Sequence, residues 1–272
     1  MNKDIKQAKE LAKQARITTL EITYRAKASH IASNFSCTDI LSTLYECYLA
    51  INPSDPNNKE NDIFILSKGH AAVGLYAILA EKKFFPKEEL INYGKNGTEL
   101  AGHISHHVPG VIFSTGSLGH GLGLTCGVAL GKNKTTSTSK TICLLSDGEL
   151  NEGSVWEAFL FAAHHKLKNL TCIIDKNNLQ GLGATQDIIN TGDLKKKLEA
   201  FNFTVYEVDG HNHEQIITAL SAQSDNNKPK VIIANTIKGK GVSFMENNNV
   251  WHYRSPTTEE YNLAREELLN NA

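Results

Sequence analysis

The sequence has no long hydrophobic run and no excess of charge of either sign. Its 272 residues carry 28 Lys and Arg against 29 Asp and Glu, which gives a formal net charge of -1. A chain without a broad positive field has no general attraction for nucleic acid or for anionic lipid. The segment 1–20 mixes charges into every turn and lacks the apolar core of a signal peptide or membrane anchor. We therefore expect no nucleic-acid partner, no membrane attachment and a cytoplasmic location.

Cysteine is scarce and its spacing is irregular. The five cysteines are odd in number, and no two of them form a Cys-x-x-Cys pair. Disulfide frameworks and zinc sites depend on even numbers or regular spacings, so neither is expected. We predict reduced thiols in the core, as is usual in a reducing compartment. With 40% hydrophobic and 21% charged residues, the composition is that of an ordinary folded domain.

What the sequence does contain is a series of short apolar runs separated by helical patterns. The runs lie at 141–146, 170–175, 203–208 and 230–235. Each is continuously apolar, which is typical of parallel strands covered by helices on both faces. The helical patterns between them lie at 151–165, 192–201 and 214–223. The alternation predicts an α/β fold, an open doubly wound parallel sheet with helices on both faces.

Helices are also predicted at the two ends of the chain. Apolar residues recur at helical spacing over 5–15 and again over 38–50, and the polar segment 53–61 reads as a surface loop. Thr257 and Glu260 have the spacing of a capping box and predict a closing helix. The length allows one large domain or two small ones, and we expect a single domain over 1–272.

Polar residues follow two of the predicted strands. Asp147 and Gly148 come after the first run, and Asn177 comes after the next, about thirty residues later. Ligands of doubly wound sheets bind at the carboxyl ends of the strands, where these side chains can meet. A carboxylate, an amide oxygen and a loop carbonyl form the oxygen set that Mg²⁺ or Ca²⁺ prefers. A helix beginning after Gly148 would direct its free N–H groups at an anion, so we predict a metal-bound diphosphate.

The Asp-Gly followed by a distant Asn-Asn resembles the signature of thiamine diphosphate enzymes, and the surrounding segments resemble the transketolase family. They are ILSKGHAA (65–72), STGSLGHGLGLTCGVALG (114–131), SDGELNEGSVWEA (146–158) and KGKGVSFMENNNVWHYR (238–254). The segments occur in the family's order, and the resemblance extends from about residue 25 to 255. Ser146 replaces the first glycine of the family's Gly-Asp-Gly. The resemblance implies the family's diphosphate-binding domain.

The resemblance also implies which residues form the site. For the metal, Mg²⁺ or alternatively Ca²⁺ or Mn²⁺, it implies Asp147, Asn177 and the backbone carbonyl of Leu179. For thiamine diphosphate it implies these first two residues together with His70, Gly116, Ser117, Leu118, Gly148, Glu149 and His252.

For catalysis, the resemblance implies that His30, His103 and His252 line the substrate channel and pass protons. Glu152 and Glu157 match acidic positions that face the subunit interface and support activation of the cofactor. A structural or surface role is expected for His106, His107, His164, His165, His211 and His213, with His120 intermediate. Lys238 and Lys240 are read as surface residues or as phosphate contacts.

Only the first of the family's three domains has a counterpart in the sequence. The pyrimidine-binding domain, which supplies a glutamate that activates the cofactor, and the C-terminal domain are not matched. The resemblance thus implies the N-terminal subunit of a two-component transketolase, whose partner subunit carries the other two domains. Because the family builds its active sites between subunits, we expect an α2β2 assembly. The implied reaction transfers a two-carbon ketol unit from a ketose, or its phosphate, to an aldose.

Three other functions are considered. The chain could be the diphosphate-binding subunit of a 2-oxoacid dehydrogenase, but the Gly-Ser-Leu-Gly-His-Gly segment and the histidines argue against this. It could be a 1-deoxy-xylulose-5-phosphate synthase, which is a longer chain. A noncatalytic cofactor-binding remnant is disfavoured by the retained metal set. The sequence leaves open which ketose and aldose react, and whether the pathway is the pentose phosphate pathway or a specialised one.

Overall fold

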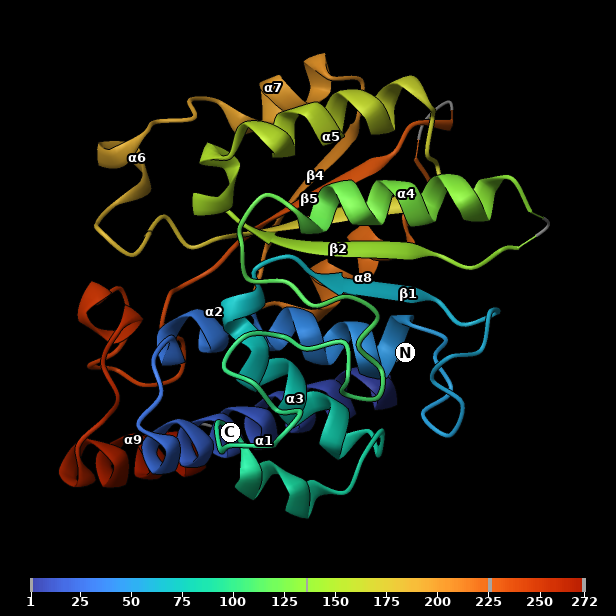
Figure 1. Cartoon of the computed structure of the whole chain (residues 1–272). Helices are drawn as coiled ribbons and strands as arrows, with labels where there is room; N and C mark the ends of the chain where they lie inside the picture. The colour runs from blue at the N-terminus through green and yellow to red at the C-terminus, as the bar shows by residue number, and fades with distance from the viewer. Residues whose placement is uncertain (1, 136, 225–226, 271–272) are drawn as a thin grey trace.

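A parallel β-sheet organises the chain in a computed structural model that describes residues 2–135, 137–224 and 227–270 (Figure 1). Within these residues the sheet contains β1 (Ile63–Leu66), β2 (Thr141–Ser146), β3 (Leu170–Lys176), β4 (Thr204–Asp209) and β5 (Lys230–Asn235). The strands lie in the order β1-β2-β3-β5-β4, and every neighbouring pair is parallel. The predicted doubly wound parallel sheet is confirmed.

Helices cover both faces of the sheet (Figure 1). The face drawn lower carries α1 (Asn2–Ala26), α2 (Ile31–Thr43), α3 (Ala72–Glu81) and α8 (His213–Ser221), and the opposite face carries α4 (Gly121–Asn133), α5 (Gly153–His164) and α7 (Leu194–Ala200). Side chains alternate along the strands, so Ile142 and Leu144 join the first core and Cys143 and Leu145 the second. α9 (Thr258–Asn270) packs against α1.

The structure differs from the strand predictions at β1 and at β4. β1 was not predicted, because its four residues run directly into the Ser-Lys-Gly-His segment and give too short a pattern. β4 was predicted to be buried on both faces, but it is one of the two edge strands, and in it Tyr206 is half-buried and Glu207 is exposed. Continuous burial holds for the interior strand β2, in which every residue is buried.

The helix predicted from the capping box is present, and the helix predicted over 38–50 has different ends. The predicted capping box is present, since the Glu260 amide donates to Thr257 Oγ1 at 3.3 Å and the Thr257 amide donates to a Glu260 carboxylate oxygen at 2.8 Å. The predicted helix over 38–50 begins earlier, as α2, and ends in the π-helical turn η1 (Leu44–Tyr48). Short turns complete the fold: η2 (Gly69–Ala71), η3 (Lys87–Asn92), η4 (Gly148–Asn151), α6 (Thr185–Ile188) and η6 (Asn249–His252).

The described part of the chain contains no helix with the length and apolarity needed to cross a membrane. The five cysteines are all unpaired thiols, four of them buried.

Candidate active site

A pocket of about 350 Å³ opens at the carboxyl ends of β2 and β3, where strand ends and helix starts converge. Most of the predicted site residues line it: His30, His70, His103, Gly116, Leu118, Asp147, Gly148, Glu152, Asn177, Leu179 and His252. Four larger hollows, two of about 400 Å³ and two of about 540 and 550 Å³, lie elsewhere on the surface and contain none of these residues. Most of the predicted site residues are therefore gathered in this smaller pocket.

One side of the pocket, here called the acidic edge, consists of Asp147, Asn177 and Leu179. The sheet register pairs Ser146 with Asp175, which brings the residues after β2 and β3 to the same level. The Asp147 carboxylate accepts hydrogen bonds from the amides of Gly148, at 2.8 Å, and Asn178, at 2.6 Å. The structure thus places together the oxygen groups that the strand-end spacing predicted.

Asp147 is in an environment that disfavours its charge. Burial, followed by the neighbouring Asp175 carboxylate, raises the pKa of Asp147 to about 6, and the two amide donors only partly oppose this shift. A carboxylate whose charge is destabilised in this way gains from a bound cation.

The other side, here called the histidine wall, consists of His30, His70, His103 and His252. The ring centroid of His30 lies 4.9 Å from that of His252, 5.3 Å from that of His70 and 5.8 Å from that of His103. These residues come from four separate chain segments. His30 adopts a left-handed conformation, with φ of 70°, just before α2, and its amide donates to the His252 carbonyl at 2.8 Å. That backbone contact joins two of the segments directly.

Burial keeps three of these imidazoles neutral. It lowers the pKa of His30 to about 4, with a further contribution from His103, and lowers the pKa of His70 well below its usual value. Burial and the nearby Lys238 cation lower the pKa of His252 to about 3. The expected proton-passing role needs a pKa nearer to neutral. In the structure these rings are neutral hydrogen-bonding groups, which suits them to binding the hydroxyls of a sugar.

A buried ion pair underlies the pocket. The side chains of Lys68 and Asp175 are completely buried, and the lysine donates to the carboxylate and to the Ser33 carbonyl. The carboxylate also accepts from Ser36 and Thr236. Burial alone would lower the pKa of Lys68, but the Asp175 charge outweighs it and raises that pKa. Sequence reasoning missed this lysine because lysines are normally exposed; its place between a buried strand and a Gly-His pair was the available signal.

Lys238 is a second buried lysine, and its interpretation as a surface residue is wrong. Its side chain is 1% exposed and donates to Gln180 O at 3.2 Å, Asn249 Oδ1 at 3.1 Å and His252 Nδ1 at 3.0 Å. Burial, then the Lys68 charge, lowers the pKa of Lys238 to about 8. Lys240, by contrast, is partly exposed and pairs with Glu246.

Three of the predicted site residues do not line the pocket. Glu149 is fully buried beneath it, where its carboxylate accepts from Ser67 Oγ and from the amide of Gly119 at 2.9 Å. Ser117 and Glu157 are exposed. The short turn η4 begins at Gly148, and α5 begins only at Gly153, so the predicted helix does not start directly after Gly148.

Comparisons with known proteins assign the chain to a family. The family model for the thiamine diphosphate-binding domain of transketolase matches residues 7–271. An apulose-4-phosphate transketolase subunit of Actinobacillus succinogenes is 45% identical over 88% of this chain and 87% of its own length. The corresponding subunit of Phocaeicola vulgatus is 39% identical over 92% of this chain and 89% of its own.

Complete transketolases also match, and the chain spans about two fifths of their length. Human transketolase is 40% identical over 90% of this chain and 39% of its own. The crystal structure of transketolase from Campylobacter jejuni superposes with a TM-score of 0.90 at 30% identity, over 97% of this chain and 43% of that one. This chain therefore belongs to the transketolase family, as a thiamine diphosphate-binding N-terminal chain of the kind found in split transketolases.

Proposed function

We propose that this chain is the cofactor-binding subunit of a two-chain transketolase that moves a two-carbon ketol unit from a ketose phosphate to an aldose or its phosphate. The observation that carries the proposal is that the acidic edge and the histidine wall line one pocket. The first substrate to test is apulose 4-phosphate, because two relatives that this chain matches along most of their length are named for it.

The acidic edge is suited to one Mg²⁺ ion bound together with a diphosphate. The Asp147 carboxylate accepts hydrogen bonds from the amides of Gly148 and Asn178 and from the Thr185 hydroxyl at 3.4 Å. At least one of its lone pairs therefore stays available for a metal ion. The Leu179 carbonyl accepts one bond, from Lys238 at 3.4 Å, which leaves its second lone pair.

Three protein oxygens do not complete an octahedral shell. Among the described residues no group of three or more His, Cys, Asp and Glu could hold a metal ion. Mg²⁺ normally combines one or two protein carboxylates with phosphate oxygens and water, so a single carboxylate here implies that the cofactor supplies further ligands. Two glycines that line the pocket have no space for a side chain: a Cβ on Gly148 would lie 2.9 Å from Gln180, and one on Gly116 would lie 3.0 Å from the His103 ring.

The protein residues would bind and orient the substrate. Bound thiamine diphosphate would supply the carbon nucleophile that ketol transfer requires. The imidazole rings of His30, His103 and His252 would accept and donate hydrogen bonds to the ketose hydroxyls and hold the sugar in the pocket. His70 and His252 would also contact thiamine diphosphate. Lys238 donates to His252 Nδ1, so that ring would present its Nε2–H as a donor.

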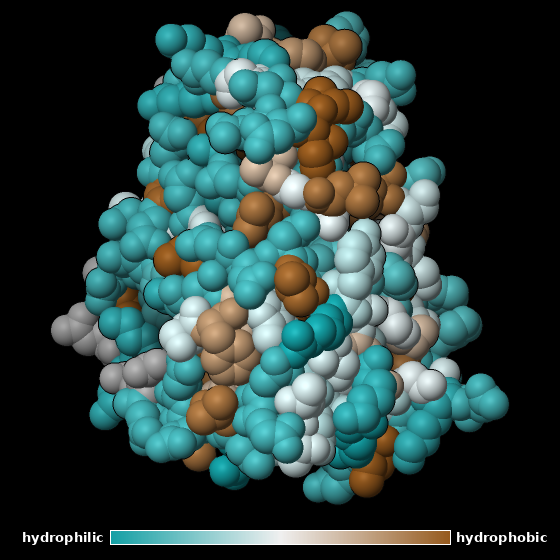
Figure 2. Space-filling view, turned by 90° about the vertical axis from the view of Figure 1, so that its left-hand side faces the viewer, coloured by the Kyte–Doolittle hydropathy of each residue, from teal (hydrophilic) through white to brown (hydrophobic). Residues whose placement is uncertain are grey.

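The partner subunit would bind where the pocket opens to solvent. Leu182, on the rim, is 87% exposed, Ile189 is 58% exposed, and Glu152 is exposed beside them. Figure 2 views the molecule from the side on which α6 lies, and apolar side chains are scattered over that face among polar ones. Exposed apolar side chains around a binding site are typical of a protein interface.

The proposed partner is a chain that carries the pyrimidine-binding and C-terminal domains, assembled with this one as α2β2. On α5, Glu157 and Leu160 are exposed and would extend the interface. A cytoplasmic location belongs to the same proposal and is supported by the five unpaired thiols. This chain would form a single diphosphate-binding domain.

Co-expression with the gene for such a partner tests the proposal. We expect a complex that transfers a ketol unit from a ketose phosphate to an aldose when thiamine diphosphate and Mg²⁺ are present. A panel of ketose phosphates headed by apulose 4-phosphate identifies the donor. A complex that oxidises pyruvate with an artificial acceptor, and ignores ketoses, would indicate a 2-oxoacid dehydrogenase instead. A partner that binds without producing any turnover would contradict the enzymatic function.

A further inference from the structure

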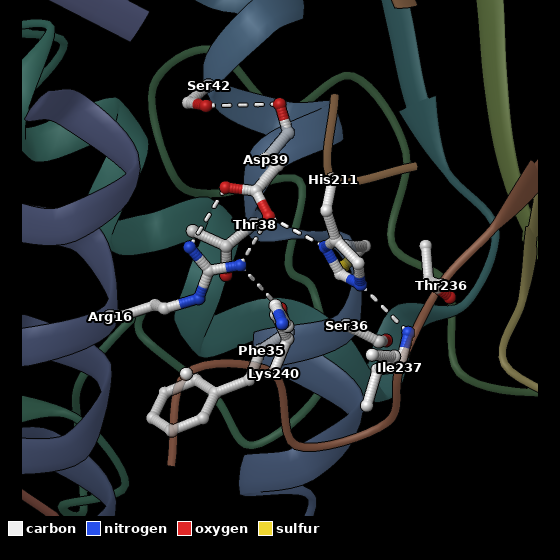
Figure 3. A network of polar contacts seen from close by, with 12 residues as sticks. Arg16, Phe35, Ser36, Thr38, Asp39, Ser42, His211, Thr236, Ile237 and Lys240 are labelled. Atoms are coloured by element: carbon white, nitrogen blue, oxygen red, sulfur yellow. Dashed lines mark hydrogen bonds and ion pairs between the residues drawn. The ribbon is translucent and has the colours of Figure 1, made fainter. Parts of the chain in front are cut away.

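A polar network lies outside the pocket and connects α1, α2 and the loop after β4 (Figure 3). Arg16 donates through Nη1 to Asp39 Oδ1 at 2.9 Å and through Nη2 to Asp39 Oδ2 at 2.6 Å. Arg16 is 8% exposed and Asp39 is 6% exposed. Such a bidentate pair holds a carboxylate in a fixed orientation. Neither residue lines the pocket, and the proposed function does not use them.

His211 connects this network to the segment that enters the pocket. Its Nδ1 lies 2.7 Å from Asp39 Oδ2, and its Nε2 lies 2.8 Å from the amide nitrogen of Ile237 (Figure 3). A backbone amide can only donate, so Nε2 accepts, and the ring proton lies on Nδ1 and is donated to Asp39. His211 is thus held on one side by a fixed carboxylate and holds a backbone amide on the other.

Ile237 lies between two residues that make polar contacts around the pocket. Thr236 donates to Asp175, the carboxylate of the buried ion pair. Lys238 donates to His252 Nδ1 at 3.0 Å and to Gln180 O at 3.2 Å. The segment is also confined further along, because the Gly239 amide donates to Ala32 O at 3.0 Å. The contact between His211 and the Ile237 amide is thus one of three that hold the backbone on either side of Lys238.

We propose that His211 is a positioning residue of the active site. Fixed by Asp39, it anchors the Ile237 amide, which places Lys238 against His252 and leaves the His252 Nε2–H free to donate into the pocket. The proposal gives His211 a part in the active site, whereas the sequence alone predicted a structural or surface role for it. Its catalytic consequence rests on the proposed transketolase function, whereas its effect on His252 does not.

Two substitutions of His211 separate the two contacts of its ring. In His211→Gln, the side-chain oxygen can take the place of Nε2 and accept from the Ile237 amide. In His211→Asn, the shorter side chain can still donate to Asp39 but cannot reach Ile237. His213→Gln is the matched control, because His213 bonds Thr43 at 2.7 Å and comes no nearer to Asp39 than 3.7 Å.

The first measurement uses the isolated full chain and needs no activity. In histidine-labelled protein at pH 7, ¹⁵N NMR should show His252 with a bare Nδ1 and a protonated Nε2. We expect His211→Asn to shift both signals towards tautomer-averaged values, as Lys238→Met also should, while His211→Gln and His213→Gln leave them in place. Unchanged His252 signals in His211→Asn would overturn the proposal. Shifts in His211→Gln as large as those in His211→Asn would also overturn it.

The second measurement uses the complex with its partner subunit. We expect His211→Asn to lower kcat/KM for the ketose by about tenfold, as supporting residues that orient a site group commonly do, and His211→Gln to restore most of it. Adding His211→Asn to Lys238→Met should cause little further loss, because both act on the same contact. Fully additive losses would show that His211 does not act through Lys238. A parent complex without activity would refute the proposed function but not the positioning of His252.

Discussion

The acidic edge and the histidine wall line the same pocket but are constructed differently. The edge comes from two neighbouring strands, and the parallel register alone brings Asp147 and Asn177 to one level. The wall comes from four segments between residues 30 and 252, which are joined by contacts such as the amide of His30 on the carbonyl of His252. The sheet register fixes the acidic edge as soon as the fold forms. The histidine wall is built from loops, and its geometry depends on individual polar contacts that lie outside the pocket.

The two sides also differ in charge. Asp147 provides the edge with a carboxylate whose charge needs a cation, while burial holds His30 and His252 neutral. The edge is thereby suited to a metal-bound anion and the wall to the uncharged hydroxyl groups of a sugar. This separation of the cofactor end from the sugar end can be tested by substitutions on either side.

The largest effect is expected from the ion pair that supports both sides. Lys68→Met leaves the Asp175 carboxylate buried without its cation, which should lower the free energy of unfolding by about 3–5 kcal/mol. Urea unfolding measures this loss. The control is Lys82→Met, which breaks the half-exposed pair of Lys82 with Glu46 and should cost about 1 kcal/mol or less. Similar losses in the two variants would mean that the buried pair does not support the pocket.

At the acidic edge, Asp147→Ala should weaken binding of thiamine diphosphate with Mg²⁺ by at least about 100-fold, because the only carboxylate of the metal set is lost. Calorimetric titration of the isolated chain measures the affinity. The exposed Asp187 in α6 supplies the control, since Asp187→Ala removes a carboxylate that does not line the pocket. Unaltered binding by Asp147→Ala would refute the metal assignment.

The affinity of the isolated chain for Mg²⁺ should increase with pH. The metal needs the ionised carboxylate, and the pKa of Asp147 in the free protein is raised to about 6. Affinity for Mg²⁺ alone should therefore rise with pH through this value and level off above it. In the folded protein a raised carboxyl pKa also means that ionisation favours unfolding, so the free chain should lose stability as pH rises from about 4 to 6. An affinity for Mg²⁺ that does not change between pH 5 and pH 7 would contradict the assignment of Asp147.

On the histidine wall, His103→Ala should lower kcat/KM for the ketose by about tenfold, which corresponds to the loss of one or two hydrogen bonds to sugar hydroxyls. Cofactor affinity should stay at the parent value. Steady-state kinetics of the complex give the first quantity and titration gives the second. His106→Ala is the control, because His106 is exposed and bonds Ser114 outside the pocket. An equal loss in both variants would remove His103 from the site.

The smallest effect is expected at the rim. Leu182→Ser should weaken binding of the partner subunit by about fivefold, because one exposed leucine loses apolar contact in the interface. Leu263→Ser in α9, where the leucine is 55% exposed and lies outside the pocket, should leave partner binding intact. Biolayer interferometry with the two purified subunits measures both. Equal affinities for the two variants would place the interface elsewhere.

The sequence predicted the acidic edge because strand register is a local property repeated along the sheet. A buried strand followed by Asp147, and the next followed by Asn177, are enough to bring two side chains together. β4 was misjudged for a related reason: its composition resembles that of the central strands, but the chain crosses to β5 and leaves β4 at the edge. Strand order is a long-range property that apolar composition does not specify.

The histidine wall could be predicted only through the resemblance, because its members are far apart in the sequence. Lys68 was missed, and the burial of Lys238 was not predicted, because a lysine is buried only when specific partners surround it, and those partners are distant. For Lys68 they include Asp175, and for Lys238 they include Asn249 and His252. No sequence pattern indicated that His211 would bond the Ile237 amide.

The central claim is that the metal that anchors the cofactor binds on one side of the pocket and the sugar binds on the other. The most direct test measures thiamine diphosphate affinity and ketose kcat/KM together, in the complex, for Asp147→Ala and His103→Ala. We predict that Asp147→Ala loses cofactor affinity, and activity with it, while His103→Ala keeps cofactor affinity and loses only ketose turnover. A parallel loss of both quantities in His103→Ala would contradict the division of the pocket.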